Sequence, residues 1–318
     1  MIVRRLTRTA LLVLAATVVV FAATEALPGD AASLREAGRA SPEQVAQARE
    51  QLGLDQPVVV RYLRWLSGLL QGDLGSSLSS GRPVSDLLGQ RLPATASLVA
   101  VALGTTALLT VAGLIVTQLR RGRGGMLAAG LAAVPQAVYA AALGALLSAT
   151  LGWLPAVSLL PPGGNPWQDP RTLVLPALTL ALPSAAYAST LLRGVLTDTL
   201  RRPHVVDAYR RGLPPMLVLL RHVRPFLVVP ALQVLALTAG WLAAGTALVE
   251  TVYGLPGLGG LLVSAVAVRD IPVVQGAALM PVVTVLLGML LADLAAAAVH
   301  RTGRPATVRS ARTVESSS

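Results

Sequence analysis

The 318-residue chain contains no cysteine and no lysine, so all 26 of its basic residues are arginines. Without cysteine there can be no disulfides, thiolate metal sites or cysteine nucleophiles. A P-loop needs a lysine on the nucleotide phosphates, so this chain cannot be a Walker-type ATPase by itself. Its three histidines show no HExxH spacing, and no GxSxG string occurs. We therefore expect no enzyme activity of its own, no catalytic residues, no cofactor and no metal site.

Charge is also scarce, whereas apolar residues are abundant. Hydrophobic residues make up 54% of the chain, charged residues only 13%, and the mean hydropathy is +0.66. This composition is typical of a multi-spanning membrane protein. A hydrocarbon core of about 30 Å needs about 20 residues at about 1.5 Å each. We predict an all-α integral membrane fold with about six spans, near Leu6–Ala26, Ala94–Leu119, Met126–Leu151, Thr172–Leu196, Phe226–Val249 and Gly276–His300.

The arginines predict the orientation of these spans. With six spans, the termini share a side with the loops at 119–125 and 193–224, and this side carries 17 arginines and three acidic residues. The opposite side carries nine arginines and 11 acidic residues. By the positive-inside rule both termini are cytoplasmic. The net charge of +11 thus reflects topology, and we expect lipid but no nucleic acid as a partner.

The chain divides into four parts on this interpretation. They are an N-terminal span at 1–26, an extracytoplasmic helical segment at 27–93, a core of five spans at 94–300 and a disordered tail at 301–318. A basic start followed by an apolar stretch also fits a cleaved signal peptide, an alternative that the sequence leaves open.

The extracytoplasmic segment has its own helical patterns. The string SPEQVAQAREQLGL begins with a capping-box spacing and ends at a glycine, which predicts a helix. The string VVVRYLRWLSGLL is amphipathic, and its Tyr62 and Trp65 suit a membrane interface. We expect a small folded element on the outer surface.

The loop at 201–225 is rich in arginine and has one central glycine. Its pattern predicts two short helices joined at Gly212, with arginines on the aqueous side and Leu217, Leu219 and Leu220 available to a partner groove. An interfacial loop whose arginines meet anionic headgroups is an equally good interpretation of the residues alone.

The chain resembles a known family along nearly its whole length. Ala208, Gly212 and Pro230 have the spacing of the EAA motif of ABC importer permeases. Further strings resemble, in order, the first permease subunit of the dipeptide, oligopeptide and nickel importers: LPGD (27–30), LGLDQP (52–57), GDLGSSLSSGRPV (72–84), RLPAT (91–95), LGWLPA (151–156), LVLPALTLALP (173–183), LLRH (219–222), VETVYGLPGLGGLL (249–262) and RDIPVVQG (269–276).

The resemblance implies a type I permease fold and a transport function without bond chemistry. It implies a second homologous permease subunit, two cytoplasmic ATP-binding subunits and an extracytoplasmic substrate-binding protein, with peptides, a related small solute or nickel as substrate. It makes 201–225 the cytoplasmic coupling region that docks into the ATPase. The implied coupling residues are Asp207, Ala208, Arg210, Arg211, Gly212, Leu213, Leu217 and Pro230.

Two features depart from the family pattern in this region. Pro214 and Pro215 follow Gly212 directly, and Pro225 and Phe226 stand where the family has arginine and asparagine. Since proline breaks helix interiors, we expect a short or reshaped coupling helix.

A second candidate site lies before the last span. The resemblance implies a helix near the outer gate, and the alternative is a plain extracytoplasmic turn with an interface helix. The gate candidates are Glu250, Tyr253, Pro256 and Gly257. Asp293, in the last span, is predicted to have a structural or subunit-contact role.

Two other functions remain as alternatives. A secondary transporter needs ionisable residues within the membrane, and Asp293 is the only clear one. A non-transporting membrane scaffold is suggested only by the prolines in the coupling region.

Overall fold

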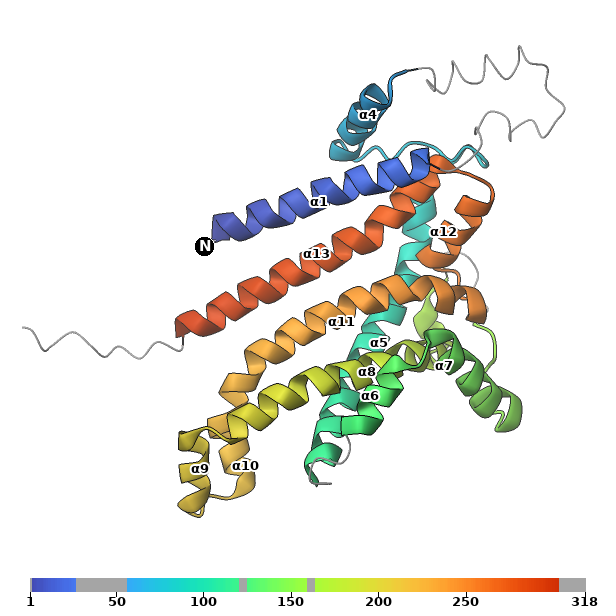
Figure 1. Ribbon diagram of the computed structural model, residues 1–318. Coiled ribbons are helices and arrows are strands. Elements are labelled where there is room, and N and C mark those ends of the chain that lie inside the picture. The colour runs from blue at the N-terminus through green and yellow to red at the C-terminus, as the bar shows by residue number, and fades with distance from the viewer. Residues whose placement is uncertain (1, 27–55, 120–124, 159–163, 303–318) are drawn as a thin grey trace, which may run out of the picture.

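The computed structural model describes residues 2–26, 56–119, 125–158 and 164–302 (Figure 1). Within these ranges the chain is almost entirely helical, and its β-type pairing is an isolated bridge between Ser76 and Pro83. The elements, in chain order, are α1 (Ile2–Glu25), α4 (Val58–Leu70), α5 (Val84–Leu119), α6 (Gly125–Ala133), α7 (Gln136–Leu143), η1 (Gly144–Thr150), η2 (Pro166–Gln168), α8 (Arg171–Leu200), α9 (Pro203–Arg210), α10 (Pro215–Val218), η3 (Leu219–Val223), α11 (Arg224–Tyr253), α12 (Leu258–Ala267) and α13 (Ile271–Thr302).

Five stretches of the described chain are long and apolar enough to cross a membrane. They are Leu6–Glu25, Val84–Thr117, Arg171–Leu200, Pro215–Tyr253 and Ile271–Leu290. Each matches a span expected from the sequence, although α5 begins ten residues earlier than predicted, at Val84. The all-α membrane fold is therefore confirmed.

The remaining predicted span, Met126–Leu151, is not one continuous helix. It is divided into α6, α7 and the π-helix η1. The break falls at Pro135, whose φ of −57° and ψ of 141° start a new helix at Gln136. Proline has no N–H and disfavours helical geometry in the residue before it, which explains why the apolar run divides here.

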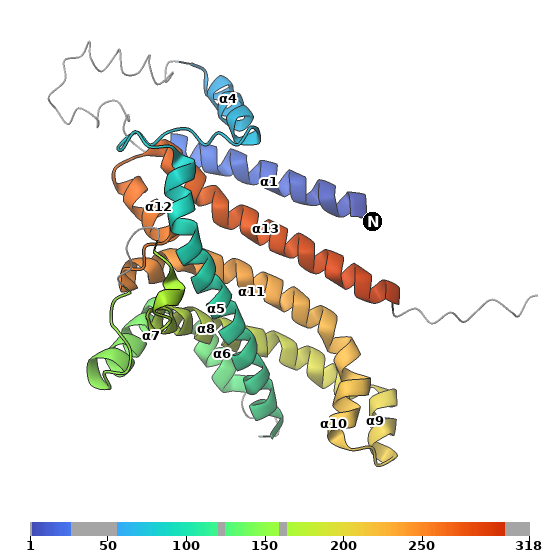
Figure 2. The ribbon, with the colours of Figure 1, turned by 180° about the vertical axis from the view of Figure 1, so that it is seen from behind.

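Helix α8 is the most deeply buried of the five long helices. It packs against α5, α11 and α6, and two-thirds of its apolar stretch is buried, far more than in α1 or α11 (Figures 1 and 2). Leu173, Leu175 and Leu180 of α8 join Leu98 of α5 and Leu242 of α11 in the main core cluster. Lipid chains are as apolar as leucine, so between membrane-spanning helices such a cluster stabilises the bundle through van der Waals packing and not through removal from water.

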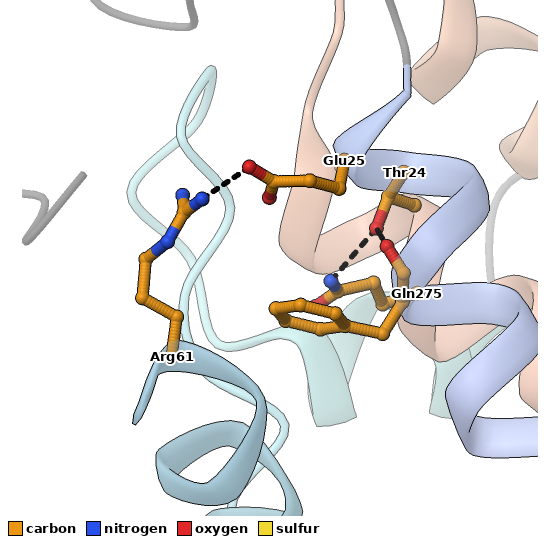
Figure 3. A network of polar contacts seen from close by, with 5 residues as sticks. Thr24, Glu25, Arg61 and Gln275 are labelled. Carbon is orange, nitrogen blue, oxygen red and sulfur yellow. Dashed lines mark hydrogen bonds and ion pairs between the residues drawn. The ribbon is translucent and has the colours of Figure 1, made fainter. Parts of the chain in front are cut away.

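The N-terminal helix belongs to the bundle, since α1 runs alongside α13 in both views (Figures 1 and 2). A buried polar contact fixes their register, in which the Gln275 Nε2 amide donates to Thr24 Oγ1 at 3.0 Å. Thr24 Oγ1 in turn donates to the Phe21 carbonyl. Beside it, Arg61 of α4 forms an ion pair with Glu25 (Figure 3).

Some sequence predictions fall outside the described residues. These are the LPGD string, the SPEQVAQAREQLGL helix and the tail from residue 303 onward. Asp293 lies in α13, but its side chain is also outside the described part of the structure. The second predicted outer helix is present as α4. Its Tyr62 and Trp65 rings both pack on Phe21 of α1, so α1 occupies one side of the aromatic pair.

Candidate functional site

The arginine-rich loop folds into two short helices at the end of α8 and α11 that lies opposite α12 (Figure 1). Helix α9 has eight residues and α10 only four, and they meet at Gly212, as predicted. Gly212 has a φ of 74°, a conformation that costs other residues about 1 kcal/mol or more. Pro215 stands at the first position of α10, where a missing N–H is harmless. The helices are short, as expected. Pro214 and Pro215 stand at the start of α10 and do not interrupt a helix.

One face of this pair is buried. Val205 and Ala208 of α9 meet Val218 of α10, Val223 of η3 and Leu196 of α8 in an apolar cluster. Ala208 is only 4% exposed, so it anchors α9 to the bundle and is not itself available to a partner.

The other face is open to a partner. Met216 and Leu217 are exposed, at 65% and 41%, and so is the ion pair between Arg211 and Asp207. Arg210 and Gly212 are exposed as well, whereas Leu213 is half-buried against the apolar cluster. Pro230, 18 residues further on, is half-buried within α11 and lies apart from the two short helices in the chain. The set of coupling residues predicted from the sequence therefore includes Ala208, which anchors the loop, exposed residues such as Leu217, and Pro230, which lies within a long apolar helix.

Phe226 braces the loop against α11. Its ring lies 5.2 Å from the His204 ring and 4.5 Å from the Arg202 guanidinium carbon, in a cation–π arrangement. Phe226 is one of the residues that departs from the family pattern. It provides a contact between the start of α9 and the start of α11.

The second candidate site lies at the other end of α11, around Glu250. This side chain is 1% exposed, and its carboxylate accepts hydrogen bonds from the Gly259 N–H at 2.6 Å and the Gly260 N–H at 3.0 Å. Thr95 of α5 donates its hydroxyl to Glu250 at 2.6 Å and accepts the Leu258 N–H at 2.8 Å. The first three N–H groups of α12 are thus satisfied by side chains from α11 and α5.

The local sequence explains why the cap comes from other helices. Gly257, which precedes α12, has no side chain to cap it, and a Cβ at Gly257 would overlap the Glu250 carboxyl group. At Gly259 a Cβ would lie 2.7 Å from the Ala247 backbone nitrogen and closer still to the Ala247 Cα. The two glycines therefore allow α12 to approach α11 at van der Waals distance.

The other gate candidates contribute to the same junction. The Tyr253 hydroxyl shares a hydrogen bond with the Thr179 hydroxyl at 2.9 Å and donates to the Ala140 carbonyl at 3.2 Å. Tyr253 thereby connects α11 to α8 and α7. Pro256 is half-buried in the turn between α11 and α12. Of the four gate candidates, Glu250 and Gly257 are in direct contact.

A cavity of about 430 Å³ lies beside this junction. It is lined mostly by apolar residues of α5, α11, α12 and α13, and Thr95 and Gly259 form part of its wall. Movement of α12 would therefore change the shape of this space. Among the residues that the structure describes, no group of three or more acidic or histidine side chains is placed to hold a metal ion.

Sequence reasoning missed Asp270, which organises the loop at 72–84. Asp270 is 2% exposed and accepts four hydrogen bonds. The Ser77 hydroxyl donates to it at 2.5 Å, the Ser79 hydroxyl at 2.8 Å, the Leu78 N–H at 3.0 Å and the Ser79 N–H at 3.1 Å. The sequence did contain a signal for this role, because Asp270 is an acidic residue directly before an apolar span and lies within the family string RDIPVVQG.

We expect Asp270 to make stability depend on acid pH. Burial tends to raise its pKa, but the bonds from Ser77, Leu78 and Ser79 outweigh burial and hold the pKa below 3.8. A lowered folded-state pKa gives stability that is present above the unfolded-state pKa and is lost as pH falls through the folded-state value. Melting temperatures of the detergent-solubilised chain between pH 7 and 3 should therefore fall more steeply below about pH 4 than those of Asp270→Asn.

Serine substitutions provide the control. Ser79→Ala removes one donor to Asp270 and should lessen the acid effect, whereas Ser264→Ala, whose hydroxyl donates to the Leu261 carbonyl, should leave it unchanged. Parallel pH curves for the parent and Asp270→Asn would refute this role.

Comparisons with known proteins agree over most of the chain. Residues 109–304 match the family described as binding-protein-dependent transport system inner membrane component, and residues 1–99 match the N-terminal membrane component of such systems. A putative peptide transport system permease protein of Brucella suis is 34% identical over 281 residues, covering 87% of this chain and 90% of that protein. Glutathione transport system permease proteins of Salmonella paratyphi A and Escherichia coli are 35% and 34% identical, covering 89% of this chain and 92% of each relative.

Proposed function

The chain belongs to the family of binding-protein-dependent transport system inner membrane components, and on that premise we propose that its α9–α10 face couples ATP hydrolysis to transport. As a member of this family it is a multi-pass permease subunit of a bacterial ABC importer, which works with ATP-hydrolysing and substrate-binding partners. We further propose that the importer contains two cytoplasmic ATP-binding subunits and a second homologous permease subunit, and that both termini of this chain are cytoplasmic.

The observation that carries the coupling assignment is the division of this loop into two faces. Val205, Ala208 and Val218 anchor it in the bundle, while Met216 and Leu217 project from it. Exposed apolar side chains on a short helix between two long ones, as in α10, favour insertion into a protein groove.

The fold suggests how a push at this face reaches the opposite side. The anchoring cluster includes Leu196 of α8 and packs against Leu227 of α11. Helix α11 has 30 residues and is about 45 Å long, and its far end carries Glu250. A rigid tilt of α8 and α11 would therefore displace α12, which we assign to the outer gate with Glu250, Tyr253, Pro256 and Gly257.

Peptides are the substrate class that we propose, because the relatives are named as peptide and glutathione permeases. The selectivity is assigned to the separate binding protein. We also propose that α1 is retained as a span, because it packs along α13 and buries Thr24 against Gln275.

Leu217→Asp tests the coupling face. A buried apolar contact replaced by a carboxylate should reduce the ATP-binding subunits recovered with the tagged chain by about tenfold, which corresponds to about 1.4 kcal/mol. Val157→Asp is the matched control, because Val157 is 45% exposed, close to the 41% of Leu217, and lies in the loop before α8, away from the coupling region. Recovery is measured by affinity purification in mild detergent with quantitative mass spectrometry.

Each outcome decides between the alternatives. If both variants retain the ATP-binding subunits equally, α9–α10 is excluded as the docking face, and the interpretation as a lipid-facing loop is favoured. If no ATP-binding subunit accompanies even the parent chain, the coupling proposal is wrong, and a secondary transporter becomes the leading interpretation.

A further inference from the structure

The region that carries α9 and α10 is basic as well as apolar. Residues 198–224 contain six arginines and two acidic residues, so their net charge is +4 when histidine is counted as neutral. The eight charged residues are all exposed: Asp198, Arg201, Arg202, Asp207, Arg210, Arg211, Arg221 and Arg224. This end of the protein therefore presents an excess of positive charge.

Two of these arginines already have a partner in the fold. Arg211 forms an ion pair with Asp207, and the Arg202 guanidinium lies over the Phe226 ring. The guanidinium groups of Arg210 and Arg221, in contrast, form no ion pair within the part of the chain that the structure describes. These two charges are available to another molecule.

Helix α9 directs Arg210 away from the bundle. Val205 and Ala208 are the buried residues of this helix. With about 3.6 residues per turn, Arg210 lies roughly on the opposite side of α9 from both of them. Arg210 therefore points outward, in agreement with its exposure.

The π-helix η3 does the same for Arg221. Val218 and Val223 are five residues apart, and bonding from residue i to i+5 brings both to the side that faces the bundle. Leu220 and Arg221 lie about half a turn from these valines, and both are exposed. They therefore share the outward side of η3.

The outward sides of α9 and η3 belong to one surface. The two elements contact each other, and both bury their inner sides in the same apolar cluster. Helices α9 and α10 stand together at one end of the bundle in both views (Figures 1 and 2). Three exposed apolar residues, Met216, Leu217 and Leu220, lie in the chain between Arg210 and Arg221. The surface thus combines apolar side chains with two unpaired positive charges.

A groove that received this surface would have to accommodate the charges. The coupling contact takes Leu217 out of water and brings the neighbouring arginines to the wall of the groove. A charge that loses water without gaining a partner is strongly unfavourable. The planar guanidinium group of arginine matches the geometry of a carboxylate, which can accept two hydrogen bonds from it.

We propose that the groove of the ATP-binding subunit that receives α10 is acidic, with carboxylates that face Arg210 and Arg221. This inference rests on the proposed coupling function and adds the chemistry of the partner surface. A lipid headgroup is the other anion that arginine binds well. The projecting pair of short helices fits a concave protein surface better than a planar bilayer, and complementary charges speed and orient protein association.

Charge reversal tests the proposal on the full chain, purified with its ATP-binding subunits in mild detergent. Arg210→Glu and Arg221→Glu should each lower the recovery of these subunits by about tenfold. Recovery with the parent should fall several fold between about 50 and about 500 mM salt, because salt screens exposed charges. Arg82→Glu is the matched control and should behave as the parent, since Arg82 is also exposed but lies in the loop before α5.

A second experiment uses the absence of lysine from this chain. Arg210→Lys and Arg221→Lys keep the positive charge, and each introduces the only side-chain amine of the chain. A carbodiimide joins an amine to a carboxylate as an amide without a spacer. It should therefore link each variant to an acidic residue of an ATP-binding subunit, identified by mass spectrometry of the cross-linked peptides. Arg82→Lys should give no such link.

The outcomes separate this proposal from the coupling function. If Leu217→Asp loses the ATP-binding subunits while Arg210→Glu and Arg221→Glu retain them, coupling stands and the acidic groove is wrong. If the charge reversals instead lower only the phosphatidylglycerol retained in native mass spectrometry, the arginines bind lipid and the acidic groove is again wrong. If the parent recovers no ATP-binding subunit, both proposals fail together.

Discussion

Alanine at Gly259 is expected to destabilise the protein by about 3 kcal/mol, at the upper end of the usual cost of overpacking. The added Cβ would overlap the Ala247 backbone, which cannot rotate away as a flexible side chain can. Helix α12 would have to move away from α11, and its bonds to Glu250 would lengthen. The melting temperature in detergent should fall by roughly 6–12 °C.

The adjacent glycine is the matched control for this substitution. A Cβ at Gly260 would lie 3.9 Å from the Leu255 carbonyl oxygen, an ordinary contact. Since alanine is also the better helix former by about 0.5–1 kcal/mol, Gly260→Ala should be neutral or slightly stabilising. Equal melting temperatures for the two variants would mean that the close approach of α12 to Ala247 is absent from the protein.

Removing the Glu250 side chain should have the largest effect, with Glu250→Ala costing about 4 kcal/mol. The buried Gly259 N–H and the half-buried Gly260 N–H would both lose their acceptor, at about 1–3 kcal/mol each. Glu250→Gln keeps one acceptor oxygen and the shape of the side chain, so it should cost less than half as much. Thermal unfolding in detergent measures both, and peptide uptake by the assembled importer should fall in the same order.

Threonine substitutions check that the effect is due to the cap of α12. Thr95→Val removes the hydroxyl that bonds both Glu250 and the Leu258 N–H, and it should cost about 2 kcal/mol. Thr105→Val removes a hydroxyl that bonds only the Val101 carbonyl of its own helix, and it should cost much less. If Glu250→Ala and Glu250→Gln were equally harmful, the loss could not be assigned to the acceptors of α12.

Local features of the chain were predicted well from the sequence. The five long spans follow from apolar runs of membrane-crossing length, and this property does not depend on the neighbours of a helix. The two short helices joined at Gly212 follow from a glycine suited to positive φ and from Pro215 at a helix start. The broken span shows the limit, because Met126–Leu151 was predicted as one span although it contains Pro135, where a new helix begins.

The roles of individual residues in the coupling loop were only partly predictable. The EAA spacing singled out Ala208 and Gly212, but not that Ala208 faces the bundle while Leu217 projects from it. When a short helix has apolar residues on two sides, its packing against neighbouring helices determines which side is buried. Here Leu196 of α8 and Val223 of η3 form the surface that determines which side is buried.

By itself, the sequence determined the all-α membrane fold class, the family and the positions of the five long spans, and it singled out both candidate sites. Those properties follow from composition, local geometry and motifs that lie within a few residues of one another. Only the tertiary structure decided that Glu250 and Thr95, 155 residues apart, cap α12 together, and that Asp270 holds Ser77 across 193 residues. A buried carboxylate can accept from any donor that packing brings within about 3 Å, so its partners depend on how the helices pack.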